Sequence, residues 1–287
     1  MPAVFVHGVP DTERVWSGVI ARLRRNDVTL SLPGFGGEAP PGFDATKEAY
    51  VDWLIAELAR QPGPMDVVGH DWGALLVTRA VSLRPEAFRS WAVGGAPLDP
   101  DYEWHQAVRL WQTPEMGERV MESMTAPGLQ KVLAAAGVPA TDAEETARHV
   151  DATMKRCILA LYRSAVHVGR EWSDDLRRIT APGLVLWGER DPYAASRFGA
   201  RLAERTNARF VCLPGCSHCG SSSGPTSWPT SCSASGRRSA HSRLEQGEGA
   251  RVGVQLGQAA DGQRGLVLDV ADHEATDRGD EIGRAHV

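Results

Sequence analysis

In the first third of the chain, short continuous apolar runs alternate with segments whose apolar residues have a helical period. Short, nearly continuous apolar runs predict buried parallel strands at residues 3–6, 28–32, 65–68 and 90–93. Between them, apolar residues recur with a helical period at residues 14–23, 47–60 and 75–83. Strands and helices that follow one another in this way predict a parallel sheet with right-handed crossover connections.

A long helical region interrupts this alternation. Residues 97–178 show helical periods and no strand pattern, including one long helix expected from about 142 to 167. A strand at 183–187, a helix at 195–205 and a strand at 208–213 then resume the alternation. We therefore predict a core at residues 1–96 and 179–219, with an all-helical lid at 97–178 inserted over the carboxyl ends of the strands, where open α/β sheets bind ligands.

The composition changes after Cys219. Residues 220–287 are dominated by Ser, Gly, Arg, Gln and Asp, with Trp228 as the only aromatic residue, and predict an irregular or disordered tail. A second hypothesis is a frameshift. Back-translation with GC-rich codons and one additional G after the His218 codon yields an amphipathic peptide that would make a closing helix. The nucleotide sequence would decide between the two.

Composition and charge exclude several classes of partner. The net charge of −5 gives no indication of a nucleic acid or an acidic membrane as partner. No apolar run approaches the ~20 residues that span a bilayer, and the N-terminus lacks the pattern of a signal peptide. Of the five cysteines, Cys212, Cys216 and Cys219 lie close together, but no second pair of ligands accompanies them, so we expect no metal site. The expectation is a cytoplasmic protein that acts on a small molecule, with its oligomeric state left open.

The most specific motif lies where the third predicted strand ends. Residues 69–73 read GHDWG, which is the G-x-Nu-x-G spacing of a nucleophile elbow, a tight strand-to-helix turn that exposes its central side chain. Gly69 and Gly73 leave room for the crowded turn. The central residue is Asp71, and a carboxylate at this place can attack an electrophilic carbon and form an ester intermediate.

Four motifs in order resemble the α/β-hydrolase fold, in its epoxide hydrolase and haloalkane dehalogenase branch. They are HGVP at residues 7–10, GHDWG at 69–73, WGERD at 187–191 and GCSH at 215–218. The resemblance covers about residues 1–219. It implies Asp71 as the nucleophile, Asp191 as the orienting acid and His218 as the base that activates water. Asp99, which follows an earlier strand, is the rival acid.

The resemblance also implies roles for residues around the triad. Backbone N–H groups of Val9 and Trp72 would stabilise the oxyanion, and Pro10 would fix the shape of the first loop. His7 and His70 would support these loops, and the Trp72 ring would line the pocket.

The leaving group is harder to predict. Dehalogenases of this branch usually carry Asn where this chain has Val9, whereas epoxide hydrolases use two lid tyrosines. Tyr162 matches one tyrosine. Alignment of the lid places Ala107 at the other, where Tyr102 or His105 would have to substitute.

The sequence thus predicts a hydrolase with an alkyl-enzyme ester intermediate, most similar to epoxide hydrolases that act on small apolar substrates. The resemblance implies neither a metal nor an organic cofactor. One alternative is a haloalkane dehalogenase or another α/β hydrolase. Another is a catalytically impaired product of a frameshifted gene.

Overall fold

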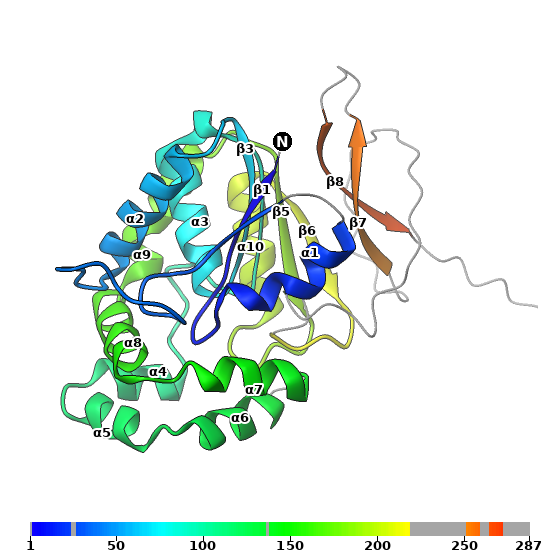
Figure 1. The fold of residues 1–287 in the computed structure, drawn as a ribbon. Helices are drawn as coiled ribbons and strands as arrows, with labels where there is room; N and C mark the ends of the chain where they lie inside the picture. The colour runs from blue at the N-terminus through cyan, green and yellow to red at the C-terminus, as the bar shows by residue number, and fades with distance from the viewer. Residues whose placement is uncertain (1, 24–26, 136–137, 219–250, 259–263, 272–287) are drawn as a thin grey trace, which may run out of the picture.

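A six-stranded, fully parallel sheet forms the centre of the computed structural model, which describes residues 2–23, 27–135, 138–218, 251–258 and 264–271 (Figure 1). The strand order is β2-β1-β3-β4-β5-β6, so the chain starts inside the sheet and extends it in both directions. The strands are β1 (Ala3–Val6), β2 (Val28–Leu30), β3 (Met65–His70), β4 (Phe88–Gly94), β5 (Gly183–Gly188) and β6 (Arg209–Leu213). The predicted parallel sheet is confirmed.

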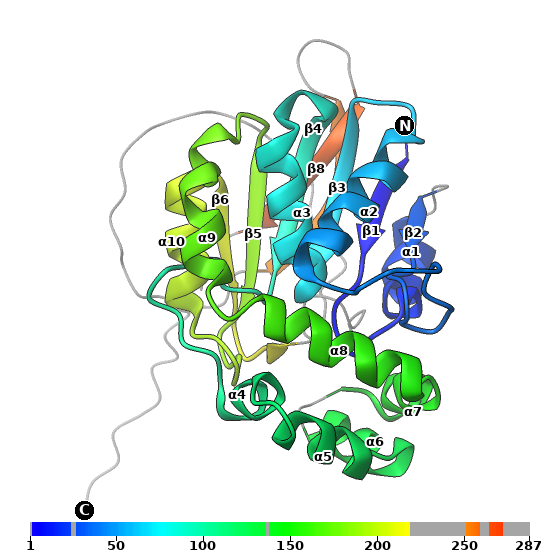
Figure 2. The same ribbon diagram turned by 90° about the vertical axis from the view of Figure 1, so that its left-hand side faces the viewer.

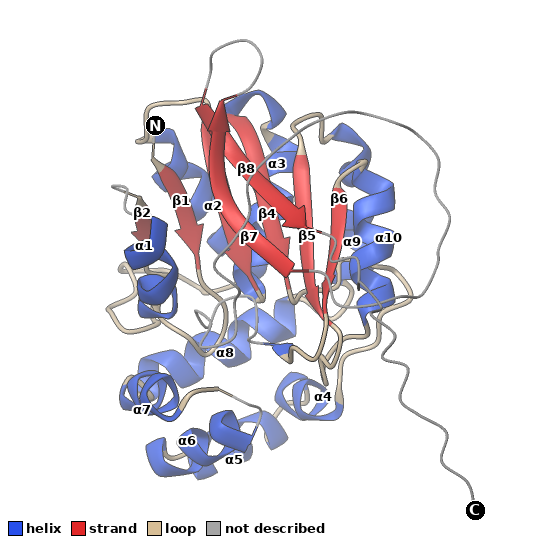
Figure 3. Cartoon of the chain, turned by 90° about the vertical axis from the view of Figure 1, so that its right-hand side faces the viewer, coloured by secondary structure: helices blue, strands red, loops and turns tan. Residues whose placement is uncertain are grey.

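Helices cover both faces of this sheet. Four lie on the face shown in Figure 2: α2 (Lys47–Ala59), α3 (Trp72–Leu83), α9 (Val168–Ser173) and α10 (Ser196–Thr206). Helix α1 (Ser17–Leu23) lies on the opposite face (Figure 3). The indole rings of Trp72, Trp91 and Trp187 are among the largest fully buried side chains of the core between these layers.

An all-helical segment joins β4 to β5 and covers the carboxyl ends of the strands (Figures 1 and 2). Before α9 it consists of α4 (Gln106–Gln112), α5 (Met116–Ser123), α6 (Ala126–Ala135), α7 (Ala140–Arg148) and α8 (Ala152–Ser164). We call the helices α4 to α8 the lid; α9, which follows them, lies on the face of the sheet (Figure 2).

The long helix expected at residues 142–167 is wrong as a single element. It is divided into α7 and α8 because Asp151 adopts extended backbone angles, with a φ of −130° and a ψ of −179°. Its carboxylate accepts a hydrogen bond of 2.7 Å from the Met154 backbone N–H, which caps the second helix. Helical periodicity alone does not distinguish this cap from a charged residue on the surface of one continuous helix.

The predicted tail contains one regular feature within the described residues. Two strands, β7 (Arg251–Gln258) and β8 (Arg264–Ala271), form a separate antiparallel sheet. Its register pairs Val252 with Val270 and Val254 with Leu268, and these residues belong to short alternating patterns of period two. The stretch 219–250, which contains Trp228 and the start of the supposed frameshift, lies outside the described residues. The frameshift stays a hypothesis.

Within the described residues, no helix is long and apolar enough to cross a membrane.

Candidate active site

Asp71 occupies a sharp turn between β3 and α3. Its backbone has a φ of 52° and a ψ of −125°, a conformation that L-residues rarely adopt, and its N–H donates to the Gly94 carbonyl at 3.0 Å. A Cβ on Gly69 would lie 2.4 Å from the Gly73 oxygen, and one on Gly73 would lie 2.2 Å from the Val6 oxygen. The turn therefore needs both glycines, and it presents the Asp71 carboxylate at the carboxyl end of the sheet.

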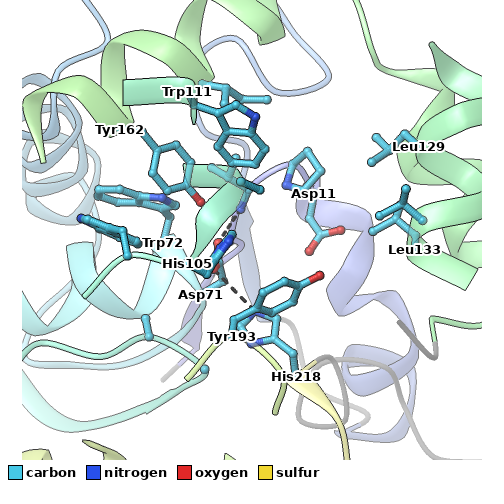
Figure 4. Close-up of a pocket in the computed structure, with 18 of the residues that line it drawn as sticks. Asp11, Asp71, Trp72, His105, Trp111, Leu129, Leu133, Tyr162, Tyr193 and His218 are labelled. Atoms are coloured by element: carbon cyan, nitrogen blue, oxygen red, sulfur yellow. Dashed lines mark hydrogen bonds and ion pairs between the residues drawn. The ribbon is translucent and has the colours of Figure 1, made fainter. Parts of the chain in front are cut away.

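The structure brings Asp71, Asp191 and His218 together from three loops at that end. Figure 4 shows Asp71 and His218 in this arrangement. His218 Nε2 lies 3.5 Å from Asp71 Oδ2, and His218 Nδ1 lies 2.8 Å from Asp191 Oδ2. The other Asp191 oxygen accepts hydrogen bonds from the backbone N–H groups of Tyr193 at 2.8 Å and Ala194 at 3.1 Å. These bonds fix the carboxylate that in turn orients the imidazole.

The rival acid Asp99 has other partners. Its Oδ2 lies 3.1 Å from Arg201 Nε, and its Oδ1 accepts from the Asp101 backbone N–H at 2.9 Å. Both oxygens are thereby occupied, so Asp191 is the acid that contacts His218.

The loop after β1 holds one oxygen of Asp71. The Val9 backbone N–H donates to Asp71 Oδ1 at 2.8 Å, which leaves Oδ2 directed toward His218. A Cβ on Gly8 would lie 2.4 Å from Asp71 Cβ, so this approach requires glycine. Val9 and Pro10 both line the adjoining cavity.

The charges of the triad are coupled. Burial alone would lower the pKa of His218, but its hydrogen bonds and charge interactions with Asp191 and Asp71 outweigh this and raise the pKa above its ordinary value. Burial would likewise raise the pKa of Asp71, yet the hydrogen bond and charge of His218 lower it. These opposite shifts in pKa favour the state in which Asp71 and His218 are both charged.

The two remaining histidines of these loops support the backbone. His7 is fully buried and does not line the cavity; its Nδ1 lies 2.8 Å from the Gly8 carbonyl and its Nε2 accepts from the Leu32 N–H at 2.9 Å. Burial lowers its pKa to about 4. His70 Nε2 donates to the His218 carbonyl at 3.0 Å, and its ring packs against the His218 ring.

Aromatic rings form the lid side of the site. The Trp72 ring stacks on Trp104 at a centroid distance of 6.1 Å, and Tyr162 meets the Trp72 ring edge-on at 5.3 Å. Trp111 packs against Tyr162 at 5.1 Å. Among the described residues the buried Trp72 indole N–H makes no hydrogen bond of normal geometry, although it interacts with the Tyr162 hydroxyl closely enough to act on the pKa of that tyrosine. Burial also raises the pKa of Tyr162 well above its ordinary value, so the phenol keeps its proton.

A cavity of about 440 Å³ lies between the triad and the lid. Its lining is mostly apolar and includes Ala107, where the second lid tyrosine was sought. The Tyr102 hydroxyl donates to the Tyr193 carbonyl at 3.2 Å, so it already has an acceptor. His105 lines the cavity and packs against the Tyr193 ring at 5.0 Å; burial lowers its pKa, so it is neutral near pH 7.

Sequence reasoning missed several cavity residues. Asp11, Tyr193, Leu129 and Leu133 all line the cavity, and Tyr193 packs edge-on against His218 (Figure 4). Asp11 directly follows the HGVP motif, and its position was the one available signal. Nothing in the periodicity of the lid distinguishes Leu129 and Leu133 from ordinary core residues.

The described residues contain no group of three His, Cys, Asp or Glu side chains placed to hold a metal ion. Cys212 and Cys216 are free thiols, and Cys219 lies outside the described residues.

A family model described as "Alpha/beta hydrolase family" matches residues 3–226, most of the chain. The chain belongs to this family. This α/β hydrolase is also similar to the (E)-2-((N-methylformamido)methylene)succinate hydrolase of Acinetobacter baylyi, with 24% identity over 71% of this chain and 78% of that protein.

Solved structures share the fold. A haloalkane dehalogenase from Bradyrhizobium elkani is 19% identical over 78% of this chain and 87% of its own, with a TM-score of 0.61. A thermophilic esterase from Thermogutta terrifontis is 20% identical over 78% and 84% of the two chains, with a TM-score of 0.58. At such low identity these likenesses show the α/β-hydrolase fold alone.

Proposed function

We propose that this hydrolase opens small epoxides through an ester intermediate on Asp71, which His218-activated water then hydrolyses. The observation that carries the proposal is the environment of the Asp71 carboxylate. Oδ1 accepts the Val9 N–H at 2.8 Å, while Oδ2 faces His218 at the cavity. One oxygen is thus held in place for an oxyanion, and the other is available for attack.

In the first step Asp71 Oδ2 forms a bond to an epoxide carbon, and the carbon–oxygen bond of the ring breaks. The released oxygen needs a proton or a hydrogen bond. Tyr162 supplies a donor, because burial keeps its hydroxyl protonated and its ring packs beside Trp72.

Ester formation changes the state of His218. It removes the negative charge of Asp71, which is one of the interactions that raise the His218 pKa. The imidazolium therefore releases its proton more readily. Tyr162 gives a proton to the opened oxygen, and the proton released by His218 replaces it, so that the net transfer is one proton from His218 to the opened oxygen. His218 then becomes a neutral base only after the ester has formed.

In the second step His218 takes a proton from water, which attacks the ester carbonyl carbon. The resulting oxyanion lies on Oδ1, where the Val9 N–H donates; the Trp72 backbone N–H is the second donor expected from the elbow. Collapse releases a diol and restores the Asp71–His218 ion pair, so the overall change is epoxide plus water to diol.

One observation favours a haloalkane as a second candidate substrate. The buried indole N–H of Trp72 makes no hydrogen bond of normal geometry among the described residues, and a departing halide would accept one from it. In this case the same ester forms, and the proton released by His218 goes to solvent.

Intact-protein mass spectrometry of the His218→Gln variant tests both candidates. After incubation with 1,2-epoxyhexane or 1-bromohexane, we expect a mass increase that peptide mapping places on Asp71. The Asp71→Asn/His218→Gln variant is the matched control and should remain unlabelled. Diol formation or bromide release by the wild-type enzyme then identifies the leaving group. The covalent mechanism would be contradicted if the wild type converts the epoxide, the bromoalkane or a simple ester while the His218→Gln variant shows no adduct on Asp71.

A further inference from the structure

Asp11 is a carboxylate in the cavity that the proposed reaction does not use. It lies on the loop after β1, two residues beyond the Val9 N–H that holds Asp71, and it lines the same cavity. In Figure 4 its carboxylate points into the cavity on the side of Leu129 and Leu133, away from Trp72 and Tyr162. A substrate whose leaving group meets Tyr162 would direct its remaining part toward Asp11.

The lid fixes only one oxygen of this carboxylate. Thr146 Oγ1 on α7 donates to Asp11 Oδ1 at 3.1 Å. Asp11 Oδ2 has no hydrogen-bond or ion-pair partner among the described residues. A carboxylate held at one oxygen and open at the other is suited to bind a donor on a ligand.

The neighbouring groups do not neutralise Asp11. Two other acids act on it, Asp71 across the cavity and Asp142 on α7, while His218 is the nearby cation. His218 is already engaged by Asp71 at 3.5 Å and by Asp191 at 2.8 Å.

The basic side chains near α7 contact Glu145 instead of Asp11. Arg14 lies 3.3 Å from Glu145, His149 lies 3.2 Å from it, and Arg148 also pairs with it. Asp11 therefore has no cation of the described protein paired with it.

Burial and the charge of Asp71 raise the pKa of Asp11 to about 6, against the opposing effects of the Thr146 hydrogen bond and of His218. Near pH 8 the carboxylate is ionised, and a partly buried unpaired charge is costly. A cation bound at Oδ2 would remove that cost.

We propose that Asp11 is a specificity-determining residue that binds a protonated amine on the substrate. The preferred substrates are then small electrophiles that carry a basic nitrogen on an aliphatic chain. This inference names the substrate class of the site and rests on the proposed function for the reaction itself.

The test measures binding without turnover. Isothermal titration calorimetry compares n-hexylamine with 1-hexanol in the Asp71→Asn variant, so that the amine cannot pair with Asp71. At pH 8 we expect the amine to bind about tenfold or more tightly than the alcohol, as for a charge-assisted hydrogen bond. The preference should decline at acid pH, where Asp11 takes up a proton; the decline should lie below pH 6, because Asp71→Asn removes one of the charges that raise the Asp11 pKa to about 6 in the wild type.

Two variants show which carboxylate is responsible. Adding Asp11→Asn should abolish the preference and leave hexanol binding unchanged, which also shows that the cavity is intact. Adding Asp142→Asn removes a nearby surface charge and should leave the preference in place. The inference is overturned if the preference survives Asp11→Asn, or if it is absent, or if it strengthens below pH 6.

Binding and reaction fail separately. An Asp11-dependent amine preference in a protein that no electrophile labels at Asp71 would refute the reaction and keep the amine site. Adducts on Asp71 without any Asp11-dependent preference for the amine would support the reaction and refute the amine site.

Discussion

The core side and the lid side of the cavity are each stabilised by a different kind of interaction. On the core side, which comprises the loops of Val9, Asp71, Asp191 and His218, hydrogen bonds of 2.8 to 3.1 Å hold the two carboxylates and the imidazole. On the lid side, which we define as Trp104, Trp111, Tyr162, Leu129 and Leu133, the contacts near the cavity are mainly ring-on-ring and apolar.

This difference separates reaction type from substrate choice. Directional hydrogen bonds fix positions to within tenths of an ångström, as catalysis by a nucleophile and a base requires. Aromatic and aliphatic packing tolerates changes of shape more readily. We therefore expect changes on the core side to abolish the reaction and changes on the lid side to alter which substrates react.

The largest expected effect comes from Asp191. Asp191→Asn should lower kcat about 10⁴-fold, because the imidazole loses the carboxylate that orients it and stabilises its cation. Asp99→Asn is the matched control: Asp99 contacts Arg201 and not His218, so its activity should stay within a few-fold of wild type. Steady-state kinetics on an epoxide that the wild type hydrolyses would measure both. Equal losses in the two variants would contradict this assignment of the acid.

The elbow backbone should be the next most sensitive feature. Gly73→Ala would place a Cβ 2.2 Å from the Val6 oxygen and should destabilise the fold by about 3 kcal/mol. A Cβ on Gly37 would meet nothing within 4 Å, so Gly37→Ala should stay within about 0.5 kcal/mol of wild type. Urea denaturation measures the two free energies of unfolding. A Gly73→Ala protein as stable as the control would show that the elbow can relax.

On the lid side, Tyr162→Phe should lower kcat/KM for epoxides about 10²-fold, because the opened oxygen loses its proton donor. The same variant should affect a bromoalkane less, since a halide leaves without a proton.

Trp72→Phe should have the opposite substrate preference from Tyr162→Phe. It removes the indole N–H, which makes no hydrogen bond of normal geometry among the described residues, and keeps an aromatic ring. It should affect the bromoalkane more than the epoxide. If either variant lowers kcat/KM equally for the epoxide and the bromoalkane, the assignment of Tyr162 to the epoxide oxygen and of Trp72 to the halide is wrong.

The smallest expected change is in the pH dependence of the alkylation step. His218 lowers the pKa of Asp71 below its ordinary value of 3.8, so the ionised nucleophile persists to more acid pH than a free carboxylate would. Single-turnover labelling of His218-containing enzyme should therefore keep a constant rate from pH 8 to about pH 4, with its decline centred below 3.8. A decline centred at 3.8 or higher would show that Asp71 is not held ionised by His218.

Most of the core could be predicted from local sequence. Apolar runs and glycine spacing located the strands and the elbow because burial and backbone crowding act on neighbouring residues. The lid was predicted less well. Asp151 divides the expected long helix through a cap, and a cap is not visible in helical periodicity. The predicted tail also contains β7 and β8, where the sequence has short alternating patterns of period two.

The sequence by itself determined the order of the elements and the chemical types of Asp71, Asp191 and His218. Only the tertiary structure decided that Asp191 and not Asp99 contacts His218. It also decided that the Trp72 N–H makes no hydrogen bond of normal geometry among the described residues, and that Asp11 faces the cavity. The physical reason is that the hydrophobic pattern of a segment indicates only which of its own side chains are buried. Pairing, desolvation and charge coupling arise between segments far apart in the chain, and they exist only once the loops meet at the end of the sheet.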